Sequence, residues 1–199
     1  VGMNGIHQQF SKLLRDRESG RSRGARAFTP TYLERYYRGS SAFVKRFTLE
    51  RELEWHDGCV NTIFFTPSGC NLISGSDDQN IVIGDWQTGK VRLSYHSGHE
   101  NNVFQAKTMP LSDERVIVSC AADGRVRVGM LTEAGDPETR QLGYHSGRAH
   151  KLALDPSSSQ VFYSAGEDGV VLQLDLRAAQ SDTPLLRATG ERPGRPGAR

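Results

Sequence analysis

A repeated set of three polar residues limits what this chain can fold into. A His, a Ser and an Asp return three times in the same order. The sets are His56, Ser74 and Asp78; His99, Ser119 and Asp123; and His145, Ser164 and Asp168. Successive Ser residues, and successive Asp residues, are 45 positions apart. A constant interval over three copies indicates structural repeats, and a period of ~40–45 residues is typical of a propeller blade with four short strands.

The local patterns within each unit predict strands. Apolar residues at 116–118 and at 126 and 128 flank Asp123-Gly124, and the third unit repeats this order around Asp168-Gly169. Asp-Gly between apolar runs favours a tight hairpin, because both residues tolerate positive φ. The sequence therefore predicts an all-β fold, a partial β-propeller with three recognisable blades.

Composition changes outside the repeats. Residues 1–55 carry 11 Lys/Arg and 6 Asp/Glu, whereas residues 56–199 carry 14 and 17. We expect a basic, partly helical or disordered arm over 1–42, the repeats over 43–177 and a disordered tail over 178–199. Within these, a short helix is expected after Thr29 and an outer strand over 43–54. Three blades cannot close a usual seven-blade ring, so we expect a truncated form that exposes apolar flanks and a strand edge.

The repeats resemble the WD-repeat family, in which each unit carries a His near its start, a Ser or Thr in the second strand and an Asp in the tight turn. The family's Trp in the third strand is replaced here by Gly84, Gly129 and Leu174. A glycine in a strand is expected to leave room in the packing. Gly84→Trp is therefore predicted to stabilise the propeller.

A closer resemblance covers roughly residues 38–177. The segments that carry it are Cys59-Val60-Asn61, Ser74-Gly75-Ser76-Asp77-Asp78, Ser97-Gly98-His99, Asn102-Val103-Phe104-Gln105 and Gly166-Glu167-Asp168-Gly169. They are similar to the number-eight subfamily of DDB-and-cullin-associated factors, in its plant-like form. The resemblance implies a protein-interaction scaffold that serves as a substrate receptor of a cullin-four RING ubiquitin ligase. Its partners would be the ligase adaptor and an unknown substrate.

The same resemblance singles out Asp175 and Arg177 as adaptor-binding candidates. In receptors of this ligase, a repeat that ends in an aromatic residue, Asp, any residue and Arg is associated with docking on the adaptor. Here Leu174 replaces the aromatic residue. Arg177 is expected to lie at the surface with its guanidinium free to meet a partner, while Asp175 orients it or caps a loop.

Other functions fit less well. A His-Ser-Asp set suggests a hydrolase, but a catalytic centre is not normally repeated in every unit, so the trios are predicted to be structural and the chain not to be an enzyme. Three cysteines without a CxxC pair argue against a zinc site and a disulfide framework, and no phosphate-binding loop occurs, so no metal or cofactor is predicted.

The remaining alternative is a general WD-repeat scaffold in chromatin or RNA complexes, with the basic arm as the nucleic-acid contact. No secretory signal or membrane-length apolar run is found in the sequence. We therefore expect no membrane contact, and a location in the nucleus, the cytoplasm or both.

Overall fold

The structure is a computed structural model that describes residues 41–45, 47–132, 137–178 and 183–187. The chain divides into two compact units, Val1–Glu50 and Arg51–Arg199, and each is described by itself. The helix expected after Thr29 lies outside the described residues, as does nearly all of the basic arm.

The first unit contains a short helix, α3 (Ser41–Val44), whose turn is closed by a hydrogen bond from the Lys45 N–H to the Ser41 carbonyl at 3.0 Å. The outer strand predicted over 43–54 is wrong, because residues 47–59 form neither helix nor strand. A strand needs a neighbour for its backbone N–H and C=O groups. Among the described residues, no strand pairs with this segment.

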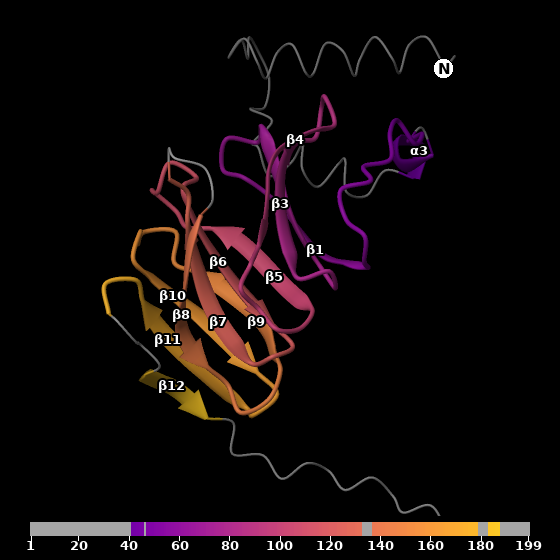
Figure 1. The fold of residues 1–199 in the computed structure, drawn as a ribbon. Coiled ribbons are helices and arrows are strands. Elements are labelled where there is room, and N and C mark those ends of the chain that lie inside the picture. Colours follow the sequence, from indigo (N-terminus) through magenta and orange to yellow (C-terminus); the bar gives the residue numbers. More distant parts are fainter. Residues whose placement is uncertain (1–40, 46, 133–136, 179–182, 188–199) are drawn as a thin grey trace, which may run out of the picture. The chain divides into compact units, whose positions relative to one another are not determined.

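The second unit consists of three four-stranded antiparallel sheets, which we call blades 1, 2 and 3 (Figure 1). Blade 1 contains β1 (Val60–Phe65), β2 (Asn71–Ser76), β3 (Asn80–Asp85) and β4 (Lys90–His96). Blade 2 contains β5 (Val103–Thr108), β6 (Val116–Ala121), β7 (Arg125–Met130) and β8 (Glu138–Tyr144). Blade 3 contains β9 (Ala149–Leu154), β10 (Val161–Gly166), β11 (Val170–Asp175) and β12 (Thr183–Arg187). The all-β, partial-propeller prediction is confirmed.

The end of blade 3 corrects the predicted domain boundary. Residues 178–199 were expected to be a disordered tail, yet Thr183–Arg187 within them form β12 and pair with β11. The side chains of β12 are all exposed, so no apolar periodicity marks it. The strand forms because β11 offers an unpaired edge, and backbone hydrogen bonding does not require an apolar side-chain pattern.

The tight turns between second and third strands have the expected geometry. Gly124 and Gly169 adopt positive φ angles of 78° and 71° after Asp123 and Asp168. This confirms the Asp-Gly hairpin prediction, since glycine enters this region without a steric penalty. In blade 1, Gln79 takes the equivalent place with φ of 67°.

Two apolar clusters hold neighbouring blades together. Between blades 1 and 2 the cluster contains Ile73, Ile81, Ile83, Tyr95, Val103, Ala106 and Ile117. Between blades 2 and 3 it contains Val118, Val126, Val128, Leu142, Leu152, Phe162 and Leu174, among others. Each sheet thus packs on the next through alternate residues of its strands. Burial of these faces supplies the main driving force for joining the blades.

The position of the missing family Trp in blade 1 is already filled by another aromatic ring. A Cβ added at Gly84 would lie 2.5 Å and 2.6 Å from two indole carbons of Trp55. The Trp55 indole N–H donates to the Gly89 carbonyl at 3.2 Å, which fixes the ring against the turn between β3 and β4. The expectation that Gly84 leaves room in the packing is therefore wrong.

In blade 2 an aromatic ring also covers the third-strand glycine, but this ring comes from the neighbouring blade. A Cβ added at Gly129 would lie 2.9 Å from the hydroxyl oxygen of Tyr95, which comes from β4 of blade 1. Trp55 and Tyr95 thus cover the third-strand glycines of blades 1 and 2. In blade 3, Leu174 occupies the position itself and is fully buried.

Candidate functional site: the polar trios and the blade-end arginine

The structure brings the three members of every trio together with nearly the same geometry. The Nδ1 atoms of His56, His99 and His145 lie 2.9, 3.1 and 3.1 Å from the nearest carboxylate oxygens of Asp78, Asp123 and Asp168. Their Nε2 atoms lie 2.7, 2.9 and 2.8 Å from the hydroxyls of Ser74, Ser119 and Ser164. An ionised carboxylate can only accept, so Nδ1 donates to it, and in the neutral imidazole Nε2 then accepts from the Ser hydroxyl.

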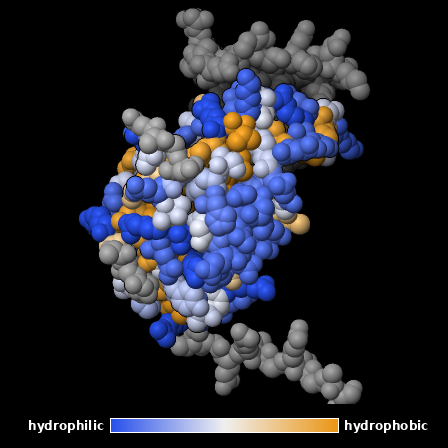
Figure 2. All heavy atoms as spheres, viewed as in Figure 1, coloured by the Kyte–Doolittle hydropathy of each residue, from blue (hydrophilic) through white to orange (hydrophobic). Residues whose placement is uncertain are grey.

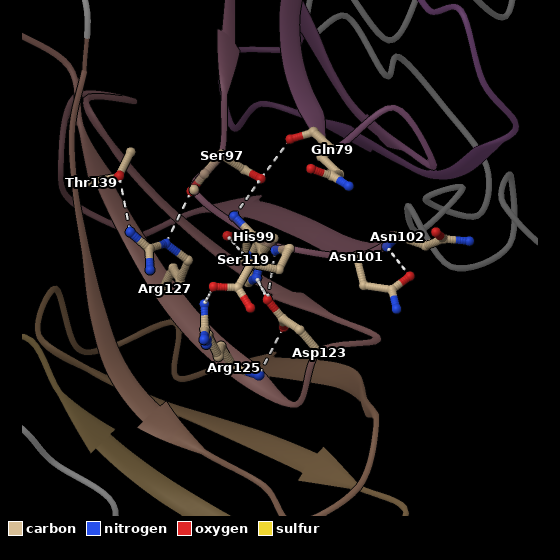
Figure 3. Close-up of polar contacts among 12 residues, drawn as sticks. Gln79, Ser97, His99, Asn101, Asn102, Ser119, Asp123, Arg125, Arg127 and Thr139 are labelled. Carbon is tan, nitrogen blue, oxygen red and sulfur yellow. Dashed lines mark hydrogen bonds and ion pairs between the residues drawn. The ribbon is translucent and has the colours of Figure 1, made fainter.

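Each Asp also accepts two backbone hydrogen bonds. In blade 2, Asp123 accepts from the Arg125 N–H at 2.9 Å (Figure 3). It also accepts from the Glu100 N–H at 3.0 Å. Asp78 and Asp168 make the same two contacts. Each accepts from the N–H of the residue that follows its His and from the N–H of the residue two positions after the Asp itself. The carboxylate therefore ties the loop that enters the blade to the hairpin between its second and third strands.

The electrostatics of the Asp residues follow from these contacts. Burial raises the pKa of Asp123, but hydrogen bonds from His99 and the Glu100 N–H outweigh it and hold the pKa below its usual value. For Asp78, burial is likewise outweighed by hydrogen bonds from the Asn80 N–H and His56, so its pKa is lowered. Asp168 behaves in the same way, with Val170 and His145 as donors. The three carboxylates are stabilised in the ionised form.

The trio geometry suits a structural role better than nucleophilic catalysis. Ser74, Ser119 and Ser164 are all buried, as are His99 and His145. A nucleophile must reach the substrate, and an oxyanion must be met by donors beside it. In each blade the Ser hydroxyl is instead the last member of an Asp–His–Ser series of hydrogen bonds, and this series satisfies buried polar groups.

The cysteines and acidic side chains of the described residues form no group of three or more that would hold a metal ion. Cys59 and Cys70 are exposed, whereas Cys120 is buried and burial raises the pKa of its thiol to about 12. A thiol with a raised pKa is a poor nucleophile and a poor metal ligand. No helix in the described parts of the chain is long and apolar enough to cross a membrane.

The predicted adaptor-binding pair lies at the end of β11. The Arg177 side chain is 72% exposed. The sequence led us to expect a free guanidinium, and this expectation is wrong. Nε and Nη2 both donate to the Asp175 carboxylate, Nε at 2.9 Å. This ion pair lowers the pKa of Asp175 to about 2, chiefly through the side-chain hydrogen bond from Arg177. Asp175 therefore orients the Arg177 fork, one of the two roles expected for it.

Arg140 supports this site from the neighbouring blade and was missed by sequence reasoning. It lies on β8, and its guanidinium donates to the carbonyl of Ala178 at 3.0 Å and to the carbonyl of Leu176. These carbonyls flank Arg177 on both sides, so Arg140 fixes the backbone that presents it. No local sequence signal predicts this contact, because the partners are 36 and 38 residues apart.

A second unpredicted contact joins the loops of blades 1 and 2. Glu114 accepts from the Ser68 N–H at 2.9 Å and from the Asn71 side-chain amide at 3.2 Å. Burial raises the pKa of Glu114, but the hydrogen bonds from Ser68 and Asn71 outweigh it and lower the pKa. The loop that carries Glu114 also holds Leu111 at a positive φ of 54°.

The face of the molecule shown in Figure 2 is mainly hydrophilic, with hydrophobic residues in smaller groups.

Comparison with known families accounts for this repeated architecture. The model of the WD domain, G-beta repeat, matches residues 47–85 and 90–128. The chain carries WD40 repeats. The two matches cover blade 1 and most of blade 2, and blade 3 shares the WD40 trio geometry found in both.

Three longer proteins are similar to this chain. WD and tetratricopeptide repeats protein 1 of Homo sapiens is 38% identical over 167 residues, which covers 83% of this chain and 24% of that protein. DDB1- and CUL4-associated factor 6 of Homo sapiens is 38% identical over 157 residues, which cover 77% of this chain and 18% of that protein. Protein ALTERED SEED GERMINATION 2 of Arabidopsis thaliana is 36% identical over 159 residues, which cover 76% of this chain and 21% of that protein. The chain thus spans about a quarter or less of the length of these relatives.

Proposed function

We propose that this WD40-repeat scaffold serves as a substrate receptor of a cullin-four RING ubiquitin ligase. The observation that carries the proposal is the 38% identity to DDB1- and CUL4-associated factor 6 over 77% of this chain. The name of that relative associates it with DDB1 and CUL4. Within such factors we propose the number-eight subfamily, which the segments around Asp78, His99 and Asp168 resemble, and a location in the nucleus, the cytoplasm or both.

Arg177 gives the proposal a contact that can be examined. Its guanidinium is exposed, and its position is set by Asp175 through the side chain and by Arg140 through the backbone. A pre-oriented Arg loses less conformational entropy on binding than a freely rotating one. An acceptor on the adaptor would share the Arg177 fork with Asp175 or replace it.

Co-precipitation of the adaptor DDB1 with the full 199-residue chain tests this function. Arg177→Ala is expected to weaken binding about thirtyfold, the effect of losing an interface Arg that contributes ~2 kcal/mol. Arg148→Ala is the matched control, because Arg148 is also exposed but lies at the opposite end of blade 3. Equal retention of the adaptor by wild type and Arg177→Ala, at equal thermal stability, would remove Arg177 from the interface.

A general scaffold in chromatin or RNA complexes is the competing function. It rests on the excess of 11 Lys/Arg over 6 Asp/Glu in residues 1–55. Binding that depends on phosphate contacts weakens steeply as salt rises. Failure to retain DDB1, together with salt-dependent binding of a mixed-sequence duplex or single-stranded RNA, would favour this function over the ligase role.

A further inference from the structure

The Arg177 guanidinium keeps one edge for a partner after Asp175 has taken the other. Nε and Nη2 donate to the Asp175 carboxylate, so this edge of the planar group faces back toward the chain. An Arg side chain carries further N–H donors on both Nη atoms, in a fixed planar fork. Within the described residues, Nη1 forms no hydrogen bond. The Nη1–Nη2 edge therefore remains to meet an acceptor, and its direction depends on how the backbone at Arg177 is held.

The N–H groups of this turn are bonded within blade 3. The Leu176 side chain is buried in the apolar cluster between blades 2 and 3, and its N–H donates to the carbonyl of Gln160 at 2.9 Å. The Arg177 N–H donates to the Asp175 carboxylate at 2.9 Å, and the Ala178 N–H donates to the Asp175 carbonyl at 3.2 Å. What blade 3 leaves to another element is the pair of carbonyls on either side of Arg177.

Arg140 of blade 2 holds both of these carbonyls. Its Nη1 donates to the Ala178 carbonyl at 3.0 Å, and its Nη2 donates to the Leu176 carbonyl. A planar guanidinium can bond two carbonyls at once, whereas a Lys ammonium is a single point of charge on a flexible stem. Rotation of the turn, and with it of the Arg177 fork, would break one or both of these hydrogen bonds.

We infer that Arg140 is a positioning residue for the adaptor contact, because it keeps the Nη1–Nη2 edge of Arg177 in one direction. The inference rests on the proposed ligase function, and it adds that a contact made by blade 3 depends on a side chain of blade 2. The adaptor meets Arg177, and Arg140 acts only through it. A fork that is ordered before binding lowers the entropy cost of the contact. Loss of Arg140 therefore weakens binding only while Arg177 is present.

A double-mutant cycle with the full chain and the adaptor DDB1 tests this coupling. Arg140→Ala is expected to weaken binding about two- to tenfold, the effect of having to order one long side chain on binding. In the Arg177→Ala background the same substitution is expected to change binding by less than about twofold, because no guanidinium is left to position. Arg140→Lys keeps the charge and one donor to a carbonyl, and is expected to recover part of the loss.

Arg127→Ala is the matched control. Arg127 is also a half-buried Arg of blade 2, and it donates to the Ser97 carbonyl at 3.1 Å and to the Thr139 hydroxyl at 3.2 Å. Thr139 and Arg140 are successive residues of β8, so their side chains lie on opposite faces of the sheet. The substitution therefore removes a comparable pair of hydrogen bonds without touching the turn at Arg177, and is expected to leave adaptor binding unchanged.

Backbone ¹⁵N relaxation of the free chain measures the positioning without the adaptor. The amides of Arg177 and Ala178 are expected to be rigid in the wild type and in Arg127→Ala, with order parameters of ~0.85, and to fall to ~0.6 in Arg140→Ala. Unchanged order parameters in Arg140→Ala overturn the role of Arg140, and so does an equal loss of binding with and without Arg177. A wild type that is rigid at Arg177 but fails to retain DDB1 overturns the ligase function, and the adaptor contact with it.

Discussion

Blade 2 and blade 1 contain the same hydrogen-bonded trio in different surroundings. Blade 2 has a sheet packed on each of its faces, through the two apolar clusters. Blade 1 has a neighbouring sheet on one face, and on the other its inner strand is exposed. The Nδ1–carboxylate distances nevertheless differ by only 0.2 Å, at 2.9 Å in blade 1 and 3.1 Å in blade 2. The geometry of a trio is therefore set within its blade, whereas its surroundings are set by the neighbours.

The largest expected effect contrasts the two faces of blade 1. Ile73→Ala removes a fully buried side chain between blades 1 and 2, and is expected to lower the free energy of unfolding by ~2–5 kcal/mol. Ile63→Ala, on the exposed face, is expected to cost less than ~0.5 kcal/mol. Urea unfolding of both variants measures the difference. Equal losses would mean that Ile63 is covered in the folded chain.

Gly84→Trp is next in expected size. The new side chain would compete with Trp55 for one space, so the substitution is expected to destabilise the chain by ~1–3 kcal/mol. The double variant Trp55→Ala with Gly84→Trp removes the competitor and is expected to recover part of the loss. Thermal unfolding of both variants and the wild type is the measurement. A raised midpoint for Gly84→Trp alone would show that Trp55 moves aside without cost.

The trios themselves give a smaller contrast between blades. Asp123→Ala leaves the His99 ring and two backbone N–H groups without an acceptor and is expected to cost ~1–3 kcal/mol. Asp78→Ala breaks the same contacts in blade 1. It is expected to cost less, because water reaches this more exposed carboxylate more easily, at 12% side-chain exposure against 7%. Chemical unfolding, together with an esterase assay, checks both. Activity lost in Ser119→Ala without loss of stability would point to catalysis instead.

The smallest effect expected is on the pH dependence of stability. The pKa of each trio Asp is lowered in the folded chain, so folding favours the ionised form. This stabilisation is present above the ordinary carboxyl pKa of about 4 and is lost as pH falls through the lower folded value. The difference in unfolding midpoint between wild type and Asp123→Asn is therefore expected to shrink below about pH 4. A difference that stays constant from neutral pH to about pH 3 would show that the carboxylate charge contributes nothing.

Local patterns in the sequence predicted much of this molecule. The 45-residue interval located all three blades, and Asp-Gly located two of the hairpins, because hairpin geometry depends on a few adjacent residues. The trio partners also emerged from the repeat, since three copies of one spacing reveal which residues share a unit. The pairing of Arg177 with Asp175 involves residues two apart, but its result, an engaged guanidinium, was not predicted.

Only the tertiary structure decided how the blades complete one another. Trp55 covers Gly84 across 29 positions, Arg140 holds the carbonyls beside Arg177 from another blade, and β12 forms on an edge that no apolar pattern announces. These contacts depend on where one packed sheet places its neighbour, and a residue's own sequence neighbourhood does not encode that position. The sequence thus determined each blade as a hydrogen-bonded unit, while packing between sheets determined which faces of the blades are covered.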